Sequence, residues 1–440
     1  MSYITILMCL ICAGSALIAL KDVFNPQFLF CSFMGLITIL ASVRLFGLTE
    51  TNFMTYLIVM LGVMCFSIGV SLSRVGRTSF RMGNISTYFF DTANLELRSK
   101  FIAGVATALL FWSIYRMWTT VIPLLRSGFS LDMIRLVYFG IEVQGYSYSR
   151  LDEIIEMFLN LPFLYALIPV VAIELTSPKE KKKLKIRTSV IILLWIVLSC
   201  IISGGRVLLY NFVVVFVVCF FIRGNKWGKV FEKAKRRMKW LFACIVLIMI
   251  YVMYQLSINR SGTGTYEFLY QIYVYFCGCM PHTSLRLETV DIDYTLGMTF
   301  LSGCLRPFML LFKYTIGGGN FPEIYQRTLE IGETLQSAVQ ISEGHTFNAF
   351  ALPFYYFYYD GGVIAVIIES FIYGFICGRA FFRYRKYPTE RNLAKYLVII
   401  IYIANSMIRF SPALVYFAFA YIYVDFCFVS NYKKIGKEHV

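Results

Sequence analysis

The side chains best suited to chemistry in this 440-residue chain include one of its three histidines. His345 lies in the run Glu343-Gly344-His345-Thr346-Phe347-Asn348, just ahead of an aromatic segment. A neutral imidazole can take a proton from a hydroxyl group at neutral pH, so His345 is a candidate general base. A structural hydrogen-bonding role is the alternative, and the sequence leaves both open.

An aromatic cluster and a carboxylate follow this histidine. Asp360 ends the run 353-PFYYFYYDGG-362, where an apolar segment begins. An ionisable group in that position is a functional candidate, but Asp before Gly361-Gly362 is equally suited to cap a helix. The tyrosines, among them Tyr359, could stack on sugar rings or form an aromatic belt at a membrane interface.

Two arginines lie in short turns between apolar runs. Arg206 ends the sequence Ser203-Gly204-Gly205-Arg206, and Arg409 lies in Met407-Ile408-Arg409-Phe410-Ser411-Pro412. A guanidinium group holds phosphate or carboxylate with a planar, bidentate fork and keeps its charge. These turns therefore indicate a phosphorylated ligand. The alternative is that each arginine only anchors its turn at a membrane surface.

The composition decides what kind of scaffold carries these residues. The chain is 58% hydrophobic, 18% aromatic and only 15% charged, with a mean hydropathy of +0.68. Soluble domains carry about a quarter charged residues. A soluble enzyme, a secreted disulfide module and a disordered regulator are therefore excluded, and the chain is predicted to be an all-α polytopic membrane protein.

Apolar windows predict about eleven membrane spans, with ten to thirteen possible. They lie near 3–20, 28–47, 53–72, 101–122, 154–175, 189–203, 207–222, 240–257, 357–378, 392–408 and 412–430. The chain thus divides into a membrane bundle over 1–257, a large loop over 258–356 and a second bundle over 357–440.

The net charge of +16 is explained by orientation in a membrane and not by nucleic acid. Basic residues concentrate in 73–100, 176–188, 223–239, 379–395 and the tail 431–440, which are alternate connections. The positive-inside rule places these segments in the cytoplasm. The C-terminus is then cytoplasmic, and the N-terminus and the large loop lie outside.

The large loop contains two apolar stretches, 266–280 and 294–315, with Glu288, Asp291 and Asp293 between them. If both stretches crossed the membrane, this acidic turn would lie inside, where the charge has the wrong sign. We therefore expect re-entrant or interfacial helices that cap the outer mouth of the bundle.

No metal or cofactor is expected. Nine of the twelve cysteines fall in apolar runs, where they act as small hydrophobic residues. The remaining Cys277, Cys279 and Cys304 lack the companions of a structural zinc site. Walker, HExxH and GxSxG motifs are absent from the sequence. Their absence argues against an ATP-driven pump, a zinc protease and a serine hydrolase.

Three motifs between residues 200 and 378 resemble bacterial oligosaccharide repeat-unit polymerases of the Wzy type, which build O-antigen and capsular polysaccharide. They are the Ser-Gly-Gly-Arg turn, the segment 348–374, and Tyr275-Phe276-Cys277-Gly278, which is similar to the Tyr-x-x-Gly turn of that family. The motifs are short and degenerate. Gly361 departs from the family pattern, in which an aromatic residue is common.

The resemblance implies a GT-C-like membrane glycosyltransferase of the bacterial inner membrane, active on its outer face without a metal. The donor would be a growing glycan on undecaprenyl diphosphate, and the acceptor a single repeat unit on the same lipid. Its partners would be a chain-length regulator, a flippase and membrane lipid. Nucleic acid would not be a partner.

The same resemblance implies roles for individual residues. His345 would be the base, with Asp360 or Glu343 as the fallback, and Arg206 would bind the diphosphate. Further substrate contacts would come from Arg260, Arg327, Arg409, Tyr275, Asn348 and Tyr359.

Two alternatives share this ligand. One is a ligase of the same superfamily, and the other is a flippase or transporter, which predicts charge buried along the bundle. The predicted spans are poor in charge, and apart from Arg116 and Glu369 their charged residues, such as Glu174 and Lys395, lie toward the span ends.

Overall fold

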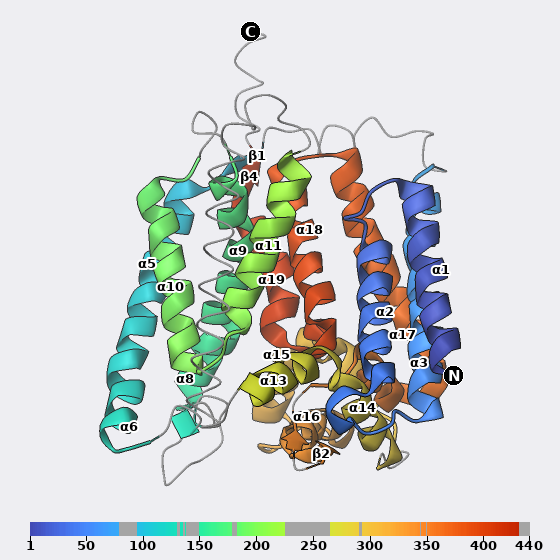
Figure 1. The fold of residues 1–440 in the computed structure, drawn as a ribbon. Coiled ribbons are helices and arrows are strands. Elements are labelled where there is room, and N and C mark those ends of the chain that lie inside the picture. Colours follow the sequence, from blue (N-terminus) through green and yellow to red (C-terminus); the bar gives the residue numbers. More distant parts are fainter. Residues whose placement is uncertain are drawn as a thin grey trace.

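The computed structural model describes residues 1–78, 95–129, 133–134, 137, 149–177, 183–224, 265–289, 293–343, 345–348 and 350–430. Figure 1 shows a bundle of helices that run nearly parallel to a common axis. The helices are α1 (Ser2–Leu20), α2 (Pro26–Val43), α3 (Phe53–Thr78), α5 (Ser99–Arg116), α6 (Ile122–Arg126), α8 (Arg150–Ile155), α9 (Leu161–Leu175), α10 (Ile186–Ser203), α11 (Val207–Gly224), α13 (Thr265–Cys277), α14 (Cys279–Glu288), α15 (Met298–Thr315), α16 (Glu323–Gln336), α17 (Pro353–Lys386), α18 (Glu390–Ala404) and α19 (Val415–Phe426).

Shorter elements complete the described chain. The π-helical turns η3 (Met117–Val121) and η4 (Glu156–Asn160) join α5 to α6 and α8 to α9, so that each pair continues as one rod. The 3₁₀ turns are η1 (Leu45–Gly47), η6 (Asn405–Met407) and η7 (Ser411–Ala413), and the strands are β1 (Leu95–Leu97), β2 (Val339–Ser342), β3 (His345–Phe347) and β4 (Phe428–Ser430).

Among the described residues, seven helical rods are long and apolar enough to cross a membrane, which is the architecture of an all-α membrane protein. They are Ser2–Leu20, Pro26–Val43, Phe53–Arg74, Ser99–Arg126, Arg150–Leu175, Ile186–Ser203 and Pro353–Lys386. Each lies at a predicted span. The predicted spans 207–222, 392–408 and 412–430 correspond to the shorter helices α11, α18 and α19. The predicted span 240–257 lies outside the described residues.

Local sequence signals explain where the helices begin and end. Asn25 accepts a hydrogen bond from the backbone N–H of Phe28 (2.7 Å) and is followed by Pro26 at the first position of α2. Thr389 caps α18 in the same way. Gly204, with a φ of 57°, ends α10 and lets the chain reverse into α11 within three residues.

Helices α3 and α17 pack with their backbones close together, and glycine makes this possible. A Cβ atom at Gly374 would overlap the carbonyl oxygen of Phe66, and one at Gly69 would overlap that of Phe371. Gly378 lies equally close to Ser73. Small residues spaced by four along a helix bring two backbones together without side chains between them.

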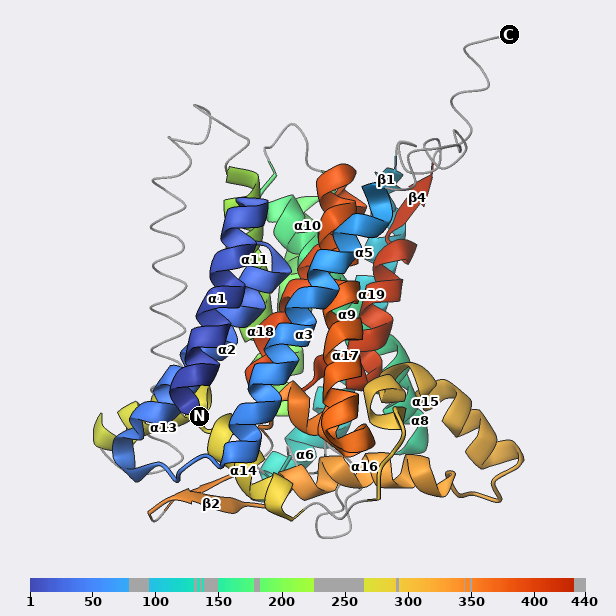
Figure 2. The same ribbon diagram turned by 90° about the vertical axis from the view of Figure 1, so that its right-hand side faces the viewer.

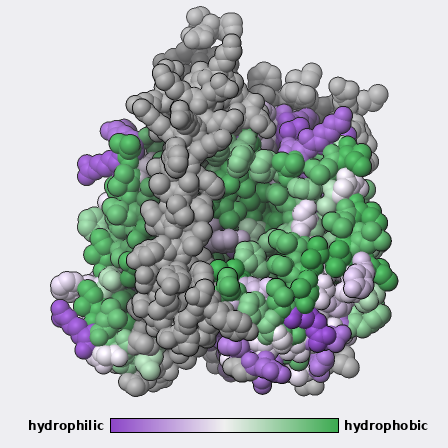
Figure 3. Space-filling model, viewed as in Figure 1, coloured by the Kyte–Doolittle hydropathy of each residue, from purple (hydrophilic) through white to green (hydrophobic). Residues whose placement is uncertain are grey.

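The two ends of the bundle differ. At the lower end in Figure 1, where α1 begins, the helices α13 to α16 and the β2–β3 hairpin form a cap that lies across the rods (Figure 2). At the upper end, β1 pairs with β4 in antiparallel register. Figure 3 shows hydrophobic surface over the middle of the bundle and hydrophilic residues toward both ends. Apolar stretches 266–280 and 294–315 form α13, the start of α14, and α15 within this cap.

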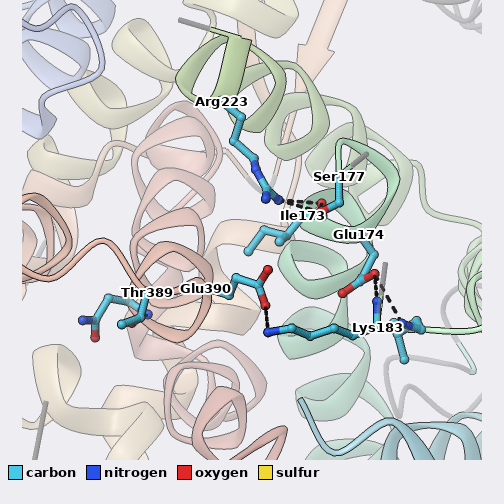
Figure 4. Close-up of polar contacts among 9 residues, drawn as sticks. Ile173, Glu174, Ser177, Lys183, Arg223, Thr389 and Glu390 are labelled. Carbon is cyan, nitrogen blue, oxygen red and sulfur yellow. Dashed lines mark hydrogen bonds and ion pairs between the residues drawn. The ribbon is translucent and has the colours of Figure 1, made fainter. Parts of the chain in front are cut away.

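Polar groups at the upper end bond mainly to one another (Figure 4). The buried carboxylate of Glu174 accepts the backbone N–H groups of Lys183 (3.0 Å) and Leu184 (3.3 Å), just before α10. Arg223 donates to the carbonyl oxygen of Ile173 (2.7 Å), and Lys183 pairs with Glu390 (2.9 Å). These contacts tie α9, α10, α11 and α18 together, so we assign them a structural role.

Candidate functional site

The turn after α18 places a cation among tyrosines at the lower end of the bundle. Arg409 is partly buried, and its guanidinium group lies within electrostatic range of the hydroxyl groups of Tyr165, Tyr356 and Tyr416. These tyrosines come from α9, α17 and α19, so three helices converge on one arginine. In the described part of the chain, no carboxylate forms an ion pair with Arg409.

One buried amide precedes Arg409 by four residues, and another lies next to Tyr165. Asn405 is 1% exposed, and its backbone carbonyl accepts the N–H of Arg409 (2.9 Å). Asn211 of α11 is 0% exposed and lies next to Tyr165. Among the described residues, neither side-chain amide has a partner within hydrogen-bonding geometry. We call these residues the Arg409 cluster: Tyr165, Asn211, Tyr356, Asn405, Arg409 and Tyr416.

Arg206 and Arg409 lie at the same end of neighbouring helices. The N–H of Tyr210 bonds to the carbonyl oxygen of Arg206 in the first turn of α11 (3.0 Å). The hydroxyl of the same tyrosine donates to the carbonyl oxygen of Ala404, the last residue of α18 (3.2 Å). Tyr210 thus joins the start of α11 to the end of α18. Arg206 is partly buried in its glycine turn, as Arg409 is in the turn after α18.

Asp360 caps a helix, but not its own. Its carboxylate accepts the backbone N–H groups of Thr299 (2.9 Å) and Phe300 (2.7 Å) and the hydroxyl of Thr295. The two N–H groups belong to the first turn of α15, whose N-cap residue is Gly297, so a carboxylate of α17 does what an N-cap side chain would do. The side chain is 2% exposed. The non-helical backbone at Gly361 and Gly362 interrupts α17 directly after it.

His345 and Glu343 belong to the β2–β3 hairpin of the cap. The imidazole stacks on the ring of Tyr270 at 4.2 Å, and Tyr270 in turn bonds to Ser342 (2.7 Å). The hairpin is fixed to the α2–α3 connection by two bonds from Thr49 to the carbonyl oxygen of Ile341. Glu343 is exposed at the hairpin turn. Among the described residues, the contacts of His345 do not include Arg206 or Arg409.

The hairpin is nevertheless connected to the Arg409 turn through the chain. Ala351, six residues after His345, donates its N–H to the carbonyl oxygen of Ile408 (3.1 Å). Six residues of extended chain span at most about 20 Å. His345 and Arg409 therefore lie on one side of the molecule without touching.

The other predicted site residues are scattered over the cap. Tyr275 packs against Phe350 (5.6 Å), and the exposed Asn348 donates to the carbonyl oxygen of Gln336 (3.1 Å). Tyr359 tilts against the ring of Tyr355. Arg327 is engaged by Asp293 (3.1 Å) and Glu323 (2.6 Å). Arg260 lies outside the described residues.

A second histidine of the cap lies in α14. His282 is buried in α14; its Nδ1 lies 2.7 Å from the carbonyl oxygen of Phe350, and its Nε2 lies 3.4 Å from Nε of Arg286. The pattern fits a neutral ring that donates through Nδ1 and accepts through Nε2. Burial lowers the pKa of His282 to about 4.

A buried ionic network lies between α5, η4 and α10, also toward the lower end. Arg116 forms an ion pair with Asp152. Asn160 donates to Glu156 (2.8 Å) and accepts from the indole N–H of Trp195 (3.0 Å). The π-helical turns η3 and η4 adjoin this network, and such turns are common where polar groups are placed inside a helix.

Chemically, the Arg409 cluster is suited to an anion that also carries hydroxyl groups. A partly buried guanidinium with no carboxylate beside it in the described residues favours phosphate. The tyrosine hydroxyls and the amides of Asn211 and Asn405 provide donors and acceptors for a polar ligand. The described residues contain no cluster of three or more His, Cys, Asp or Glu side chains that could hold a metal ion.

Sequence reasoning found Arg409 and Arg206 but missed Asn211, Asn405 and Tyr165. A usable signal existed for the two asparagines, because each is an amide inside or at the end of a strongly apolar run. Comparisons of the chain with protein-family models, with curated proteins and with solved structures find no match.

Proposed function

We propose that the protein is a membrane glycosyltransferase that joins lipid-diphosphate-linked oligosaccharide repeat units into a polysaccharide of the O-antigen or capsular type. The observation that carries the proposal is Arg409: a partly buried cation within electrostatic range of Tyr165, Tyr356 and Tyr416, without a carboxylate partner in the described residues. A diphosphate that bears a sugar matches this set of groups.

In this proposal the bundle has about eleven spans in a GT-C-like arrangement within the bacterial inner membrane. The lower end in Figure 1 faces outward, because the basic segment 379–395, which joins α17 to α18, lies at the upper end. The substrates are undecaprenyl-diphosphate-linked glycans, one as donor and one as acceptor. A flippase would deliver them, and a chain-length regulator would limit growth.

The residues divide the reaction between them. Arg409 and Arg206 hold the diphosphate, which leaves with its lipid as the acceptor hydroxyl bonds to the anomeric carbon of the donor. Fixed positive charge at the leaving group is often the largest catalytic contribution, on the order of 3 kcal/mol for one donor. His345 takes the proton of the acceptor hydroxyl. For this transfer the β2–β3 hairpin must move toward the Arg409 turn. Asp360 is the weaker candidate for the base, because its carboxylate already accepts three hydrogen bonds.

The test is glycan analysis in a deletion strain that expresses the wild-type chain, Arg409→Ala, Arg409→Lys or Arg206→Lys. We expect long-chain polymer to collapse to a single repeat unit in every variant, since lysine keeps the charge and loses the fork. Arg44→Lys is the matched control, because Arg44 pairs with Glu50 at the surface (3.1 Å) and is assigned no substrate contact, and it should polymerise normally.

Other outcomes separate the alternatives. Full-length chains that remain on the lipid and are missing from the surface would identify a ligase. Glycan that accumulates only on the cytoplasmic side would identify a flippase. Normal polymer from Arg409→Ala would reject the proposed site.

A further inference from the structure

One helix of the cap, α15, has two unlike faces. Its buried face consists of small and polar residues, including Thr299, Ser302 and Gly303, while Arg306 and Lys313 stack over the ring of Phe321 at 4.9 and 4.6 Å. Its opposite face is apolar and uncovered: Phe308 is 67% exposed and Leu311 is 63% exposed. Leu301 and Cys304 lie on the same face, three or four residues apart, as the helical repeat requires.

The first turn of α15 is fixed to the bundle. Asp360 caps it, and the hydroxyl of Ser302 donates to the carbonyl oxygen of Ala413 (2.7 Å). A Cβ atom at Gly303 would overlap the carbonyl oxygen of Pro412, so the helix backbone lies directly on the turn that follows Arg409. The uncovered apolar face is therefore held in a defined position beside the bundle.

This face continues the lipid-facing surface of the bundle. α15 packs against α17 and α19. On α17, Ile364 is 71% exposed and Ile368 is 51% exposed, which is typical of a helix that faces acyl chains. At the same end of the bundle, Trp118 is strongly exposed, as aromatic residues are at a membrane interface.

We propose that α15 is an interfacial membrane helix whose face of Leu301, Cys304, Phe308 and Leu311 lies among the phospholipid acyl chains of the leaflet at the lower end of the bundle. An amphipathic helix that lies in the interface buries its apolar side by about 5–10 Å and keeps its cationic side toward the headgroups. Arg306 and Lys313 are on that second side. The Arg409 turn, which α15 contacts, then lies at the depth of the lipid phosphates. The proposal requires only a membrane and does not depend on the reaction proposed above.

The test is photo-crosslinking of the full-length chain in bilayer nanodiscs of phosphatidylethanolamine and phosphatidylglycerol. p-Benzoylphenylalanine replaces Phe308, or Leu311 in a second variant, and lipid adducts are measured by intact-protein mass spectrometry after illumination. Ile368 is the positive control, and the exposed Glu333 of α16 is the matched polar control. Both substitutions on α15 replace exposed side chains, so the fold should be retained.

We expect lipid adducts at positions 308 and 311 with yields within about threefold of position 368, and a yield at least about tenfold lower at position 333. Crosslinks from position 308 to a second copy of the chain would overturn the proposal, because the face would then be a subunit interface. A yield at 308 and 311 as low as that at 333 would overturn it as well, since the face would then lie in water.

Discussion

At the scale of single residues, the two histidines of the cap illustrate opposite environments. His345 lies at a hairpin edge with its ring on Tyr270, whereas His282 is enclosed and bonded at both nitrogens. A buried ring that must stay neutral makes the folded state sensitive to acid, because the unfolded chain binds the proton more tightly.

The first prediction follows from the pKa of His282. A histidine in an unfolded chain has a pKa of about 6.5, and burial lowers that of His282 to about 4. The stabilisation is complete above pH 6.5 and is lost as the pH falls from 6.5 toward 4, by up to roughly 3 kcal/mol. Thermal unfolding of the purified protein in detergent at a series of pH values measures this loss.

His282→Gln removes the titrating ring, so its stability should depend less on pH between 6.5 and 4 than that of the wild type. Asn348→Ala is the matched control, because it changes an exposed side chain of the cap that does not titrate, and it should keep the wild-type slope. Equal slopes in all three proteins would show that the His282 ring is not held neutral by the fold.

Residue types predict a cation site more readily than they predict its surroundings. Arg206 and Arg409 could be found because a charged residue in a short turn between apolar runs is conspicuous. The proximity of Arg409 to Tyr165 and Tyr356 could not be found in this way, because helix packing brings together positions that are far apart in the sequence. The sequence also allowed Asp360 to be a helix cap, but its acceptor role for α15 depends on a tertiary contact.

At the scale of elements, α15 depends on a carboxylate from another helix. Asp360→Ala would leave the backbone N–H groups of Thr299 and Phe300 without their acceptor in a buried position. An unsatisfied buried donor costs about 1–3 kcal/mol, so we expect a total loss of roughly 2–5 kcal/mol. Chemical denaturation in detergent, together with limited proteolysis of the α15–α16 segment, measures it.

Asp293→Ala is the matched control for this prediction. Asp293 is also an acidic residue of the cap, but its side chain is largely exposed in its pair with Arg327, and exposed pairs contribute about 0–1 kcal/mol. If Asp360→Ala were no less stable than Asp293→Ala, the cap would not support α15.

Hydropathy located most elements of the bundle, because a rod that crosses a membrane must be continuously apolar. The acidic residues between 266–280 and 294–315, and not hydropathy, predicted that these stretches cap the bundle, and Figure 2 shows α13 and α15 in the cap. Hydropathy could not locate the breaks inside rods, such as the π-helical turns or the interruption at Gly362, whose φ is 63°. At Gly362 a Cβ atom would overlap the hydroxyl of Tyr294, so this break accommodates a neighbouring side chain.

At the scale of the whole molecule, the bundle is held together where side chains are smallest. Replacing Gly374 by valine would force α3 and α17 apart, because the added atoms would overlap the backbone at Phe66. Overpacking of this kind costs about 1–3 kcal/mol or more. We expect Gly374→Val to lower the unfolding temperature and the yield of folded protein after detergent extraction.

Gly104→Val is the matched control, because a Cβ atom at Gly104 meets nothing within 4 Å. Size-exclusion chromatography of both variants gives the folded fraction. A folded fraction for Gly374→Val as high as that of Gly104→Val would contradict the close approach of α3 and α17.

The glycine contact also has a consequence in time. Gly69 and Gly374 are separated by roughly 300 residues, and a ribosome adds about 5–20 residues per second. The third helix therefore enters the bilayer some 15–60 s before its partner has been synthesised. During that interval its glycine face is exposed to lipid or to the proteins that assist insertion. Helices α3 and α17 can pack together only after α17 has been synthesised and inserted.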